Sequence, residues 1–466
     1  NIWVGNKSGD IQVYDPNKRF IGFLNSNGRL SRQTENFDAI YALLQDKEGN
    51  IWIGTRNKGL IQLIPNGELN YRLKYYKNDP TDRFSLSCNF IFSLKEDKQG
   101  RIWIGTLGGG INYIDRDGRF IHPGNELPDY PTRFSRIKNI CIDHQNNIWL
   151  ATTSGVLFCK WSNGKLAYTP IVRNCNEKNS LSCDNVYDVF ESSKHEIFVA
   201  TFGGGLDKLT GFDKQNNGIF KNYSSPQMIS NVPLTLTEDY EGNLWIPSEN
   251  GLYRLFTGND SIEVYDSRFL PEGLLLTESR ACRLSNNEML FGTDKGLLSM
   301  NPERMKRDSH TSNLLITDIH INGERKESAD NSSEIILSHK ENSFSINYEA
   351  LDMKFPGKIE YAYRLEGFDD WNYVKNNRMA VYTNIPKGNY RFQVKSTNSD
   401  GVWSNRAKDI SITILPSFWE SAYGIILYII LFILIVAISA YILFVIYKLR
   451  NRVSVEKQIL DIKTKF

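Results

Sequence analysis

The side chains that could do chemistry in this chain do not form a catalytic or metal-binding motif. The six cysteines show no Cys-x-x-Cys spacing, so the sequence predicts neither a zinc motif nor a thiol redox site. Hydrolase or lyase chemistry would need paired carboxylates, or a histidine beside a carboxylate, facing one pocket. Asp184 and Glu249 could face a shared pocket, and His122 lies near a loop, but no spacing requires either arrangement. We therefore predict no catalytic residue, no metal ligand and no cofactor among these residues.

A repeated phrase dominates the first 300 residues. Variants of Asn-Ile-Trp-Ile-Gly-Thr recur roughly every 45–51 residues, centred on Trp3, Trp52, Trp103, Trp149, Phe198, Trp245 and Leu290. A fixed period of this length indicates a repeat architecture, and one copy reads as four short antiparallel strands, which is a propeller blade. We therefore predict an all-β chain that opens with a seven-bladed β-propeller over residues 1–301. Because the chain begins inside what reads as a second strand, we expect the first blade to be incomplete, with its inner strand upstream.

Binding residues are expected on one face of this propeller. The connections between second and third strands lie on that face together with the links between blades, whereas the Asp-led turns lie on the other face. Variable loops on a rigid scaffold commonly carry function, and a sugar site needs planar hydrogen-bonding groups and an aromatic platform. The candidate ligand-binding residues are Asp38, Arg56, Asn57, Lys58, Tyr75, Tyr76, Arg83, Asn89, Arg133, Arg136, Asp184, Phe202, Asn231, Glu249 and Asn250. The alternative for each of them is an ordinary solvated loop residue.

Three further segments follow the repeats. Residues 302–313 are polar and read as a linker, and residues 314–415 alternate in short strands separated by turn signals, which predicts an immunoglobulin- or fibronectin-like β-sandwich. Residues 423–447 carry no charge and are long enough for a transmembrane helix. Lys448, Arg450 and Arg452 follow at once, so the positive-inside rule places residues 448–466 in the cytoplasm. An apolar stripe at Val455, Ile459, Ile462 and Phe466 fits a short coiled-coil helix or a generic amphipathic one.

Taken together, these segments resemble one family. The phrase Gly49-Asn50-Ile51-Trp52-Ile53-Gly54-Thr55 with Gly59-Leu60 is similar to the two-component regulator propeller repeat. The sandwich resembles the tyrosine-rich Y_Y_Y domain through Tyr361, Tyr363, Leu365, Gly367, Trp371, Tyr382, Pro386, Gly388, Tyr390, Phe392, Val394, Asn398, Gly401, Trp403, Pro416 and Trp419. The order of parts resembles the periplasmic sensor half of hybrid two-component systems of Bacteroidetes. That resemblance implies a histidine kinase beyond Phe466, with ATP and Mg as its cofactors, and a second propeller upstream.

The resemblance also implies a function. We expect the extracytoplasmic sensing and transmembrane part of a sensor histidine kinase in the inner membrane, with residues 1–422 periplasmic, acting as a homodimer. The expected ligand is an oligosaccharide that controls polysaccharide-utilisation genes. The net charge of +2 gives no reason to expect nucleic acid as a partner of this portion. The alternatives are a one-component receptor with a directly fused DNA-binding domain, or a membrane-anchored propeller lyase or glycosidase.

Overall fold

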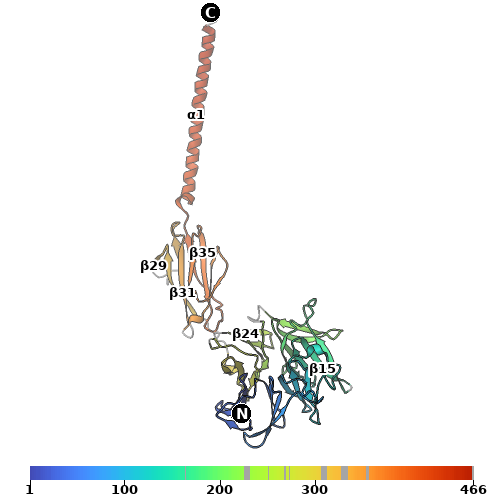
Figure 1. The fold of residues 1–466 in the computed structure, drawn as a ribbon. Coiled ribbons are helices and arrows are strands. Elements are labelled where there is room, and N and C mark those ends of the chain that lie inside the picture. Colours follow the sequence, from blue (N-terminus) through green and yellow to red (C-terminus); the bar gives the residue numbers. More distant parts are fainter. Residues whose placement is uncertain are drawn as a thin grey trace. The chain divides into compact units, whose positions relative to one another are not determined.

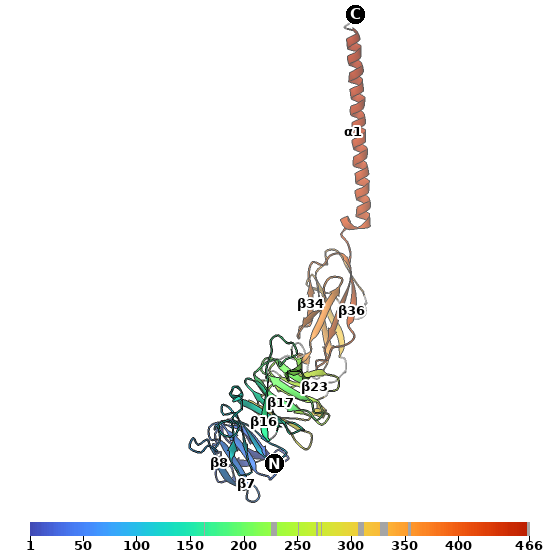
Figure 2. The ribbon, with the colours of Figure 1, turned by 90° about the vertical axis from the view of Figure 1, so that its right-hand side faces the viewer.

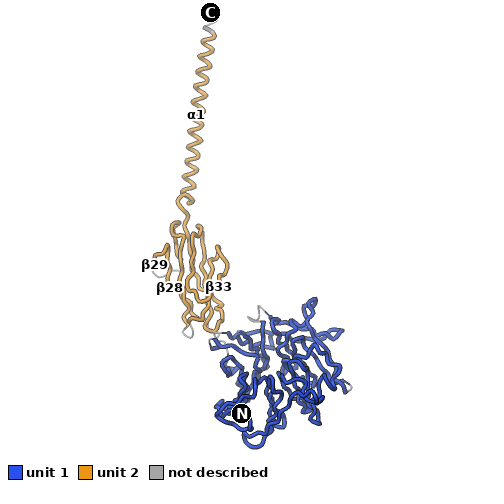
Figure 3. Tube along the Cα trace, viewed as in Figure 1, with its two compact units in different colours: residues 1–306 blue, residues 307–466 orange. Residues whose placement is uncertain are grey.

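The computed structural model describes residues 1–162, 164–224, 231–249, 251–266, 269–271, 273–305, 312–326, 334–352 and 356–463. It divides into two compact units, residues 1–306 and 307–466 (Figure 3). The division falls inside the predicted linker 302–313, of which residues 306–311 lie outside the described part. Each unit is described below by itself.

The described residues of unit 1 form seven antiparallel sheets in chain order (Figures 1 and 2). Sheets one and two comprise β1 (Ile2–Gly5), β2 (Ile11–Tyr14), β3 (Phe20–Leu24) and β4 (Leu30–Ser31), then β5 (Ile40–Gln45), β6 (Ile51–Thr55), β7 (Leu60–Pro65) and β8 (Tyr71–Tyr76). Sheets three and four comprise β9 (Ile91–Glu96), β10 (Ile102–Thr106), β11 (Ile111–Ile114) and β12 (Phe120–Ile121), then β13 (Ile137–Ile142), β14 (Ile148–Thr152), β15 (Gly155–Ser162) and β16 (Lys165–Ile171).

The remaining sheets of unit 1 follow the same order. Sheets five and six comprise β17 (Val186–Glu191), β18 (Ile197–Thr201), β19 (Gly205–Phe212) and β20 (Gly218–Tyr223), then β21 (Thr237–Glu238), β22 (Leu244–Ser248), β23 (Gly251–Phe256) and β24 (Ser261–Tyr265). Sheet seven has three strands, β25 (Cys282–Arg283), β26 (Met289–Thr293) and β27 (Gly296–Met300). Short 3₁₀ turns occupy Thr132–Phe134 and Pro302–Arg304. Unit 1 therefore has the propeller architecture that the repeat predicts.

Sheet one differs from the others in the position of its Trp strand within the sheet. Its Trp3 strand, β1, is an edge strand, whereas the equivalent strand is second in sheets two to seven. Trp3 is accordingly only partly buried, while Trp52, Trp103, Trp149 and Trp245 are buried. Sheets one and seven meet through side chains, because Lys18 Nζ lies 2.8 Å from Glu288 Oε2 and 3.3 Å from Ser299 Oγ.

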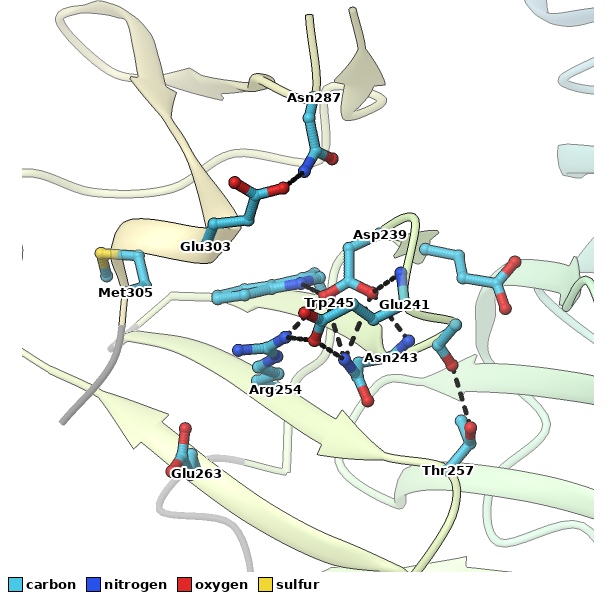
Figure 4. A network of polar contacts seen from close by, with 12 residues as sticks. Asp239, Glu241, Asn243, Trp245, Arg254, Thr257, Glu263, Asn287, Glu303 and Met305 are labelled. Atoms are coloured by element: carbon cyan, nitrogen blue, oxygen red, sulfur yellow. Dashed lines mark hydrogen bonds and ion pairs between the residues drawn. The ribbon is translucent and has the colours of Figure 1, made fainter.

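The Asp-led turn and the Trp strand that follows it are joined by a hydrogen bond. The Trp245 indole N–H donates to Asp239 Oδ2 at 2.8 Å, and Arg254 Nη2 lies 3.0 Å from the same oxygen (Figure 4). Asp46, Asp97 and Asp143 accept from the indoles of Trp52, Trp103 and Trp149 at 2.7, 2.9 and 3.0 Å. A buried indole needs such an acceptor, so the repeat phrase requires its Asp as well as its Trp.

Two other repeat positions explain why the hairpins close. The turn residue adopts positive φ, at +86° for Gly49, +80° for Gly100 and +80° for Gly242, and also at Asn146, His195 and Asn287. The left-handed region strongly favours Gly, and Asn and His are among its better substitutes. In sheets two to five the buried Thr that ends the second strand donates its hydroxyl to a glycine carbonyl across the next connection, for example Thr106 to Gly110 at 2.8 Å.

Unit 2 contains a β-sandwich with one shared core. One sheet has the order β29-β28-β31-β34, made of β28 (Asn313–Ile321), β29 (Glu324–Lys326), β31 (Phe344–Leu351) and β34 (Met379–Tyr382). The other has the order β30-β36-β35-β32-β33, made of β30 (Glu334–Leu337), β32 (Tyr361–Glu366), β33 (Asn372–Val374), β35 (Gly388–Ser396) and β36 (Lys408–Ile414). Tyr348, Tyr361, Tyr382 and Phe392 pack in the common core, so several of the tyrosines that mark this sequence are core residues.

A single helix ends the described chain. After 3₁₀ turns at Pro356–Lys358 and Phe418–Glu420, α1 runs unbroken from Ala422 to Lys463 (Figure 1). Its segment Ala422–Asp461 is long and apolar enough to cross a membrane, and none of its most apolar stretch is buried against protein. The predicted span 423–447 and the following predicted helix therefore belong to one element. The side chains of Ile462 and Phe466 lie outside the described part.

Candidate ligand-binding site

The two faces of unit 1 are defined here by their connections. The connection face carries the links between second and third strands, which include residues 56–59, 107–110, 153–154 and 202–204. The turn face carries the Asp-led turns and their equivalents at residues 46–49, 97–100, 143–146, 192–195 and 239–242. The predicted ligand-binding residues that the structure describes belong to the connection face or to the links and strand ends that lead to it.

Four inner strands carry a β-bulge at the same repeat position. In sheet two, Ile40 pairs with Thr55 and Ala42 pairs with Gly54, which leaves Tyr41 without a partner in the ladder. Phe92, Lys138 and Tyr187 are skipped in the same way in sheets three, four and five. A bulge re-aims the side chain of its extra residue and is over-represented next to functional sites. These four bulge residues are only partly buried.

The bulge residues meet one another in pairs. The ring centroids of Tyr41 and Phe92 lie 5.1 Å apart, and Lys138 Nζ lies 3.3 Å from the centroid of the Tyr187 ring. Both distances are within the range of favourable aromatic and cation–π contacts. Each pair joins two neighbouring sheets near the start of their inner strands.

Charged residues from sheets one and seven connect these pairs. Lys7 Nζ lies 5.5 Å from the centroid of the Tyr41 ring and 3.2 Å from Glu278 Oε1. Burial, and then the negative charges of Glu278 and Glu249, raise the pKa of Tyr187. Burial lowers the pKa of Lys138, with Glu278 opposing the shift. Residues of six different sheets can influence one another in this way only around the middle of the ring.

Further aromatic rings surround this group. The Phe90 ring lies 5.0 Å from Tyr41 and has the Arg56 guanidinium 5.9 Å from its centroid. Phe202 lies 5.7 Å from Tyr187 and is 44% exposed. We call the whole set the central cluster: Lys7, Tyr41, Arg56, Phe90, Phe92, Lys138, Tyr187, Phe202, Glu249 and Glu278. It combines partly exposed aromatic faces with charged groups of both signs, a composition suited to a polar ligand with apolar faces.

Buried charges lie farther along the same inner strands. The Asp188 carboxylate accepts from Leu236 N at 2.8 Å and from the Asn139 amide. Burial raises the pKa of Asp188 to about 6, although the Arg280 charge and the backbone donors oppose this shift. Arg280 Nη2 donates to the carbonyl of Ile140 at 3.4 Å, so sheet seven reaches sheet four here as well. Burial, followed by the Arg280 charge, lowers the pKa of Lys95.

Three of the residues predicted from sequence belong to the central cluster: Arg56, Phe202 and Glu249. Arg136 lies close enough to lower the pKa of Lys138, after the larger effect of burial. Asn250 lies outside the described residues. These four described residues remain candidates for ligand contact.

Several other predicted residues hold loops in place. Asp38, at φ +80°, accepts from Asn57 N and, at 3.3 Å, from Lys58 N. Burial would raise the pKa of Asp38, but these backbone donors outweigh it and lower the pKa. Asn89 and Asp184, at the equivalent position of sheets three and five, accept from the backbone N–H groups of Asn78 and Arg173, both at 2.7 Å.

Asn231 occupies the equivalent position in sheet six. Its backbone carbonyl accepts from Gly203 N and Gly205 N at 2.9 and 3.1 Å. These strand-end polar residues are thus hydrogen-bonded to connections of the same face. A ligand could still contact them, but loop anchoring already explains their chemistry.

The remaining predicted residues are spread over the face. The Tyr76 ring packs between sheets, 6.1 Å from Trp52 and 5.3 Å from Phe120. Tyr75 is 48% exposed on the outer strand β8. Arg83 lies over Phe84 at 4.9 Å, and Arg133 Nη2 lies 3.5 Å from Asp184 Oδ2. The structure does not bring these residues to the central cluster.

Unit 2 presents an open depression of about 630 Å³ on the sandwich. Glu334, Glu366, Tyr390 and Arg391 are among the residues that line it. It offers one aromatic ring among polar side chains, whereas the central cluster offers five. We therefore regard the central cluster as the stronger candidate.

Sequence reasoning missed Tyr41, Phe92, Lys138 and Tyr187. Each lies eleven residues before the centre of its repeat, at Trp52, Trp103, Trp149 and Phe198, so aligning the copies would have placed these large side chains in one column. The alignment could not have revealed the bulge, because all four copies contain it and keep the same spacing.

Two family models match parts of the chain. A model described as the two component regulator propeller matches residues 34–57 and 85–108, and the Y_Y_Y domain model matches residues 352–415. The first model covers the connection into sheet two with its Trp strand, and the same part of sheet three. The second covers most of the sandwich from β32 onward.

Comparison with known proteins gives distant relatives. The chain is 25% identical over 449 residues to histidine kinase P4 of Formosa agariphila, an alignment that covers 92% of this chain and 31% of that protein. The chain thus spans about a third of the length of this relative.

Two of the solved structures to which the chain is similar come from B. thetaiotaomicron. The extracellular domain of a putative hybrid two component system is 18% identical, with 89% of this chain and 71% of that chain covered and a TM-score of 0.44. The extracellular domain of a putative one component system is 20% identical, with 90% and 62% covered and a TM-score of 0.46. In its matched regions and its histidine kinase relative, the chain is similar to two-component sensor proteins that combine regulator propeller repeats with a Y_Y_Y domain.

Proposed function

We propose that the chain is the extracytoplasmic sensing and transmembrane part of a sensor histidine kinase, and that its ligand is an oligosaccharide bound at the central cluster. In this proposal residues 1–422 are periplasmic, α1 crosses the inner membrane, and the protein acts as a homodimer. The response would be expression of polysaccharide-utilisation genes.

The observation that carries the ligand proposal is the composition of the central cluster. Partly exposed Tyr41, Phe92 and Tyr187 offer ring faces on which the C–H faces of a sugar can stack. Lys138 and Glu278, close to those rings, offer donors and acceptors for hydroxyl or carboxylate groups. A site for a small ligand usually combines several apolar and aromatic surfaces with a small number of polar groups.

Transmission is proposed to run through the sandwich to α1. A ligand shifts an equilibrium only when it binds one state better than the other, so the two states must differ at the central cluster. The helix is continuous from Ala422 to Lys463, and a continuous helix can pass a shift or rotation from one side of a membrane to the other. The central cluster and α1 are thus the input and output ends of the proposal.

The ligand proposal is tested by calorimetry on the full chain in detergent micelles, against a panel of neutral and acidic oligosaccharides. We expect at least one glycan to bind, and Tyr187→Ala to weaken its affinity by at least tenfold, because stacking area and a hydrogen-bonding group are lost together.

The matched control is Tyr240→Ala. Tyr240 is also a tyrosine, is 58% exposed, and lies in an Asp-led turn on the opposite face. Failure of every glycan to bind would contradict the sugar proposal. Equal losses in both variants would contradict the central cluster as the binding site.

The output is tested separately. The whole protein, extended beyond Phe466, should incorporate phosphate from radiolabelled ATP onto a histidine. Absence of that labelling, together with specific DNA binding, would favour the one-component alternative instead.

A further inference from the structure

Two histidines that lie far apart in the sequence meet on the turn face. His144 lies in the turn between β13 and β14, and His195 lies in the turn between β17 and β18. Glu191, the last residue of β17, lies with them. The ring centroids of His144 and His195 are 3.9 Å apart, and the potential ligand atoms of all three residues lie within 4.8 Å of one another.

The carboxylate of Glu191 is held between the two turns. Its Oε2 accepts from the backbone N–H of His144 at 2.8 Å, which leaves Oε1 for the side chains. Oε1 lies 2.5 Å from Nδ1 of His144 and 3.4 Å from Nδ1 of His195. Glu191 is 12% exposed at its side chain, whereas both imidazoles are well exposed. One oriented oxygen therefore faces two ring nitrogens at the surface.

Packing between sheets accounts for the glutamate but not for the histidines. Glu96 and Glu238, at the equivalent position, accept from the backbone N–H groups of Lys47 and Ser193 at 3.0 and 2.8 Å. Among the described residues, neither Glu96 nor Glu238 forms a hydrogen bond or an ion pair with a histidine. Furthermore, His195 occupies a turn position with φ +64°, where the other described turns have Gly or Asn. His is a less favourable choice there than Gly.

The arrangement suits a transition metal ion. Imidazole nitrogen and a carboxylate oxygen are ligands that Zn²⁺ and its neighbours prefer, at distances of about 2.0–2.2 Å. Two ligands of one tetrahedral ion are then roughly 3.3–3.5 Å apart, which the Glu191–His195 pair already satisfies. His144 would move its ring nitrogen outward by about an ångström and carry its proton on the other nitrogen. A single carboxylate offers too few hard oxygens for Ca²⁺ or Mg²⁺.

We propose that His144, Glu191 and His195 bind a divalent transition metal ion of the zinc class, and that this ion links the turns of sheets four and five. The sequence alone predicts no metal ligand, because the two histidines belong to different repeats. The three ligands leave a coordination position for water or for a side chain of another molecule. An ion that binds the folded state stabilises it in proportion to its occupancy.

The test uses the full chain in detergent micelles with Zn²⁺ and, as a spectroscopic probe, Co²⁺. We expect one metal ion per chain, a rise in Tm with Zn²⁺, and Co²⁺ d–d bands of a nitrogen–oxygen site without a thiolate charge-transfer band. Ca²⁺ and Mg²⁺ should leave Tm unchanged. The absence of the thiolate band separates this site from any binding by the free cysteines.

Two variants remove a ligand while keeping the turn. His195→Asn introduces the residue found at the same position as Asn146, which also has positive φ, and His144→Ser introduces the residue found at the position of Ser193. Each should weaken Zn²⁺ binding by at least tenfold and abolish the Tm rise. His339→Asn, at an exposed histidine of unit 2, is the control and should bind as the parent does.

The proposal is overturned if the parent chain binds no Zn²⁺, or if it binds equally after His195→Asn and His144→Ser. An equal loss in the His339→Asn control would also overturn it, because binding would then reflect surface histidines in general.

Discussion

The carboxylate of each Asp-led turn has two functions at once. Asp97 closes its turn by accepting from Gln99 N and Arg101 N, both at 2.9 Å, and it also accepts from the Trp103 indole. The copies that lose one partner lose both: Phe198 follows Ser192, and Leu290 follows Leu284, at the same spacing of six residues. The Asp and the Trp therefore act as one unit within the repeat.

This coupling predicts non-additive stability changes. Trp103→Phe removes a donor from the buried carboxylate, and Asp97→Ser leaves the indole N–H without its acceptor, so each should cost about 1–3 kcal/mol. The double variant reproduces the Ser192–Phe198 pair of sheet five. We expect it to lose clearly less than the sum of the single variants in urea unfolding followed by circular dichroism. Strict additivity would show that the two residues act independently.

A second residue-scale prediction concerns Asp188. Burial raises its pKa from 3.8 to about 6, so the folded state holds this proton more tightly than the unfolded chain. The resulting stability is fully present below about pH 4 and is lost as the pH rises through about 6. Asp188→Asn mimics the protonated form. Its Tm relative to the parent should therefore increase between pH 4 and pH 7.

Asp207 provides an independent repetition of this test, because burial also raises its pKa to about 6. The control is Asp213→Asn. The Asn217 side chain, which donates to Asp213, lowers the pKa of that exposed carboxylate, so no such increase is expected. If the Tm difference for Asp188→Asn does not change across this pH range, the proton-linkage argument fails.

At the scale of elements, the strands and turns could be predicted from the sequence, and the bulges could not. The Gly49 and Trp52 pattern marks one turn and one strand in each copy because these positions have strict backbone or packing demands. The bulge at Tyr41 has no such mark, since the residue skipped by the ladder is different in type from one copy to the next. Contacts between residues of different repeats could not be predicted from the sequence either. His144 and His195 become neighbours only because successive turns pack side by side.

Helix α1 gives an element-scale prediction. Val455 and Ile459 are 53% and 50% exposed and share one face of the helix, so in a dimer they should form the seam between two copies. Val455→Cys, in a chain whose exposed Cys175 and Cys282 are changed to Ser, should cross-link efficiently in membranes.

Lys457→Cys is the matched control, because two positions along a helix turn the side chain to the other face. We expect weak cross-linking from Lys457→Cys under the same oxidation. Equal yields from the two positions would contradict a Val455 seam.

At the scale of the whole molecule, the chain combines a ring of sheets, a sandwich and a membrane-length helix in a fixed order. The ring places residues of all seven sheets and their connections around its middle, and only this convergence creates the central cluster. The order of units could be predicted from composition, because apolar length and strand alternation are local signals. The location of the site could not, because it depends on pairing between residues more than 200 positions apart, such as Lys7 and Glu278.

The central claim is that a ligand binds at the central cluster on the connection face. Hydrogen exchange of the full chain in micelles tests it most directly, with and without the tightest-binding oligosaccharide of the panel. We predict slower exchange in peptides that contain Tyr41, Phe92, Lys138 and Tyr187, with the Asp-led turns of the opposite face unchanged. Slowing confined to the turn face or to the sandwich, or no change at saturating ligand, would contradict the claim.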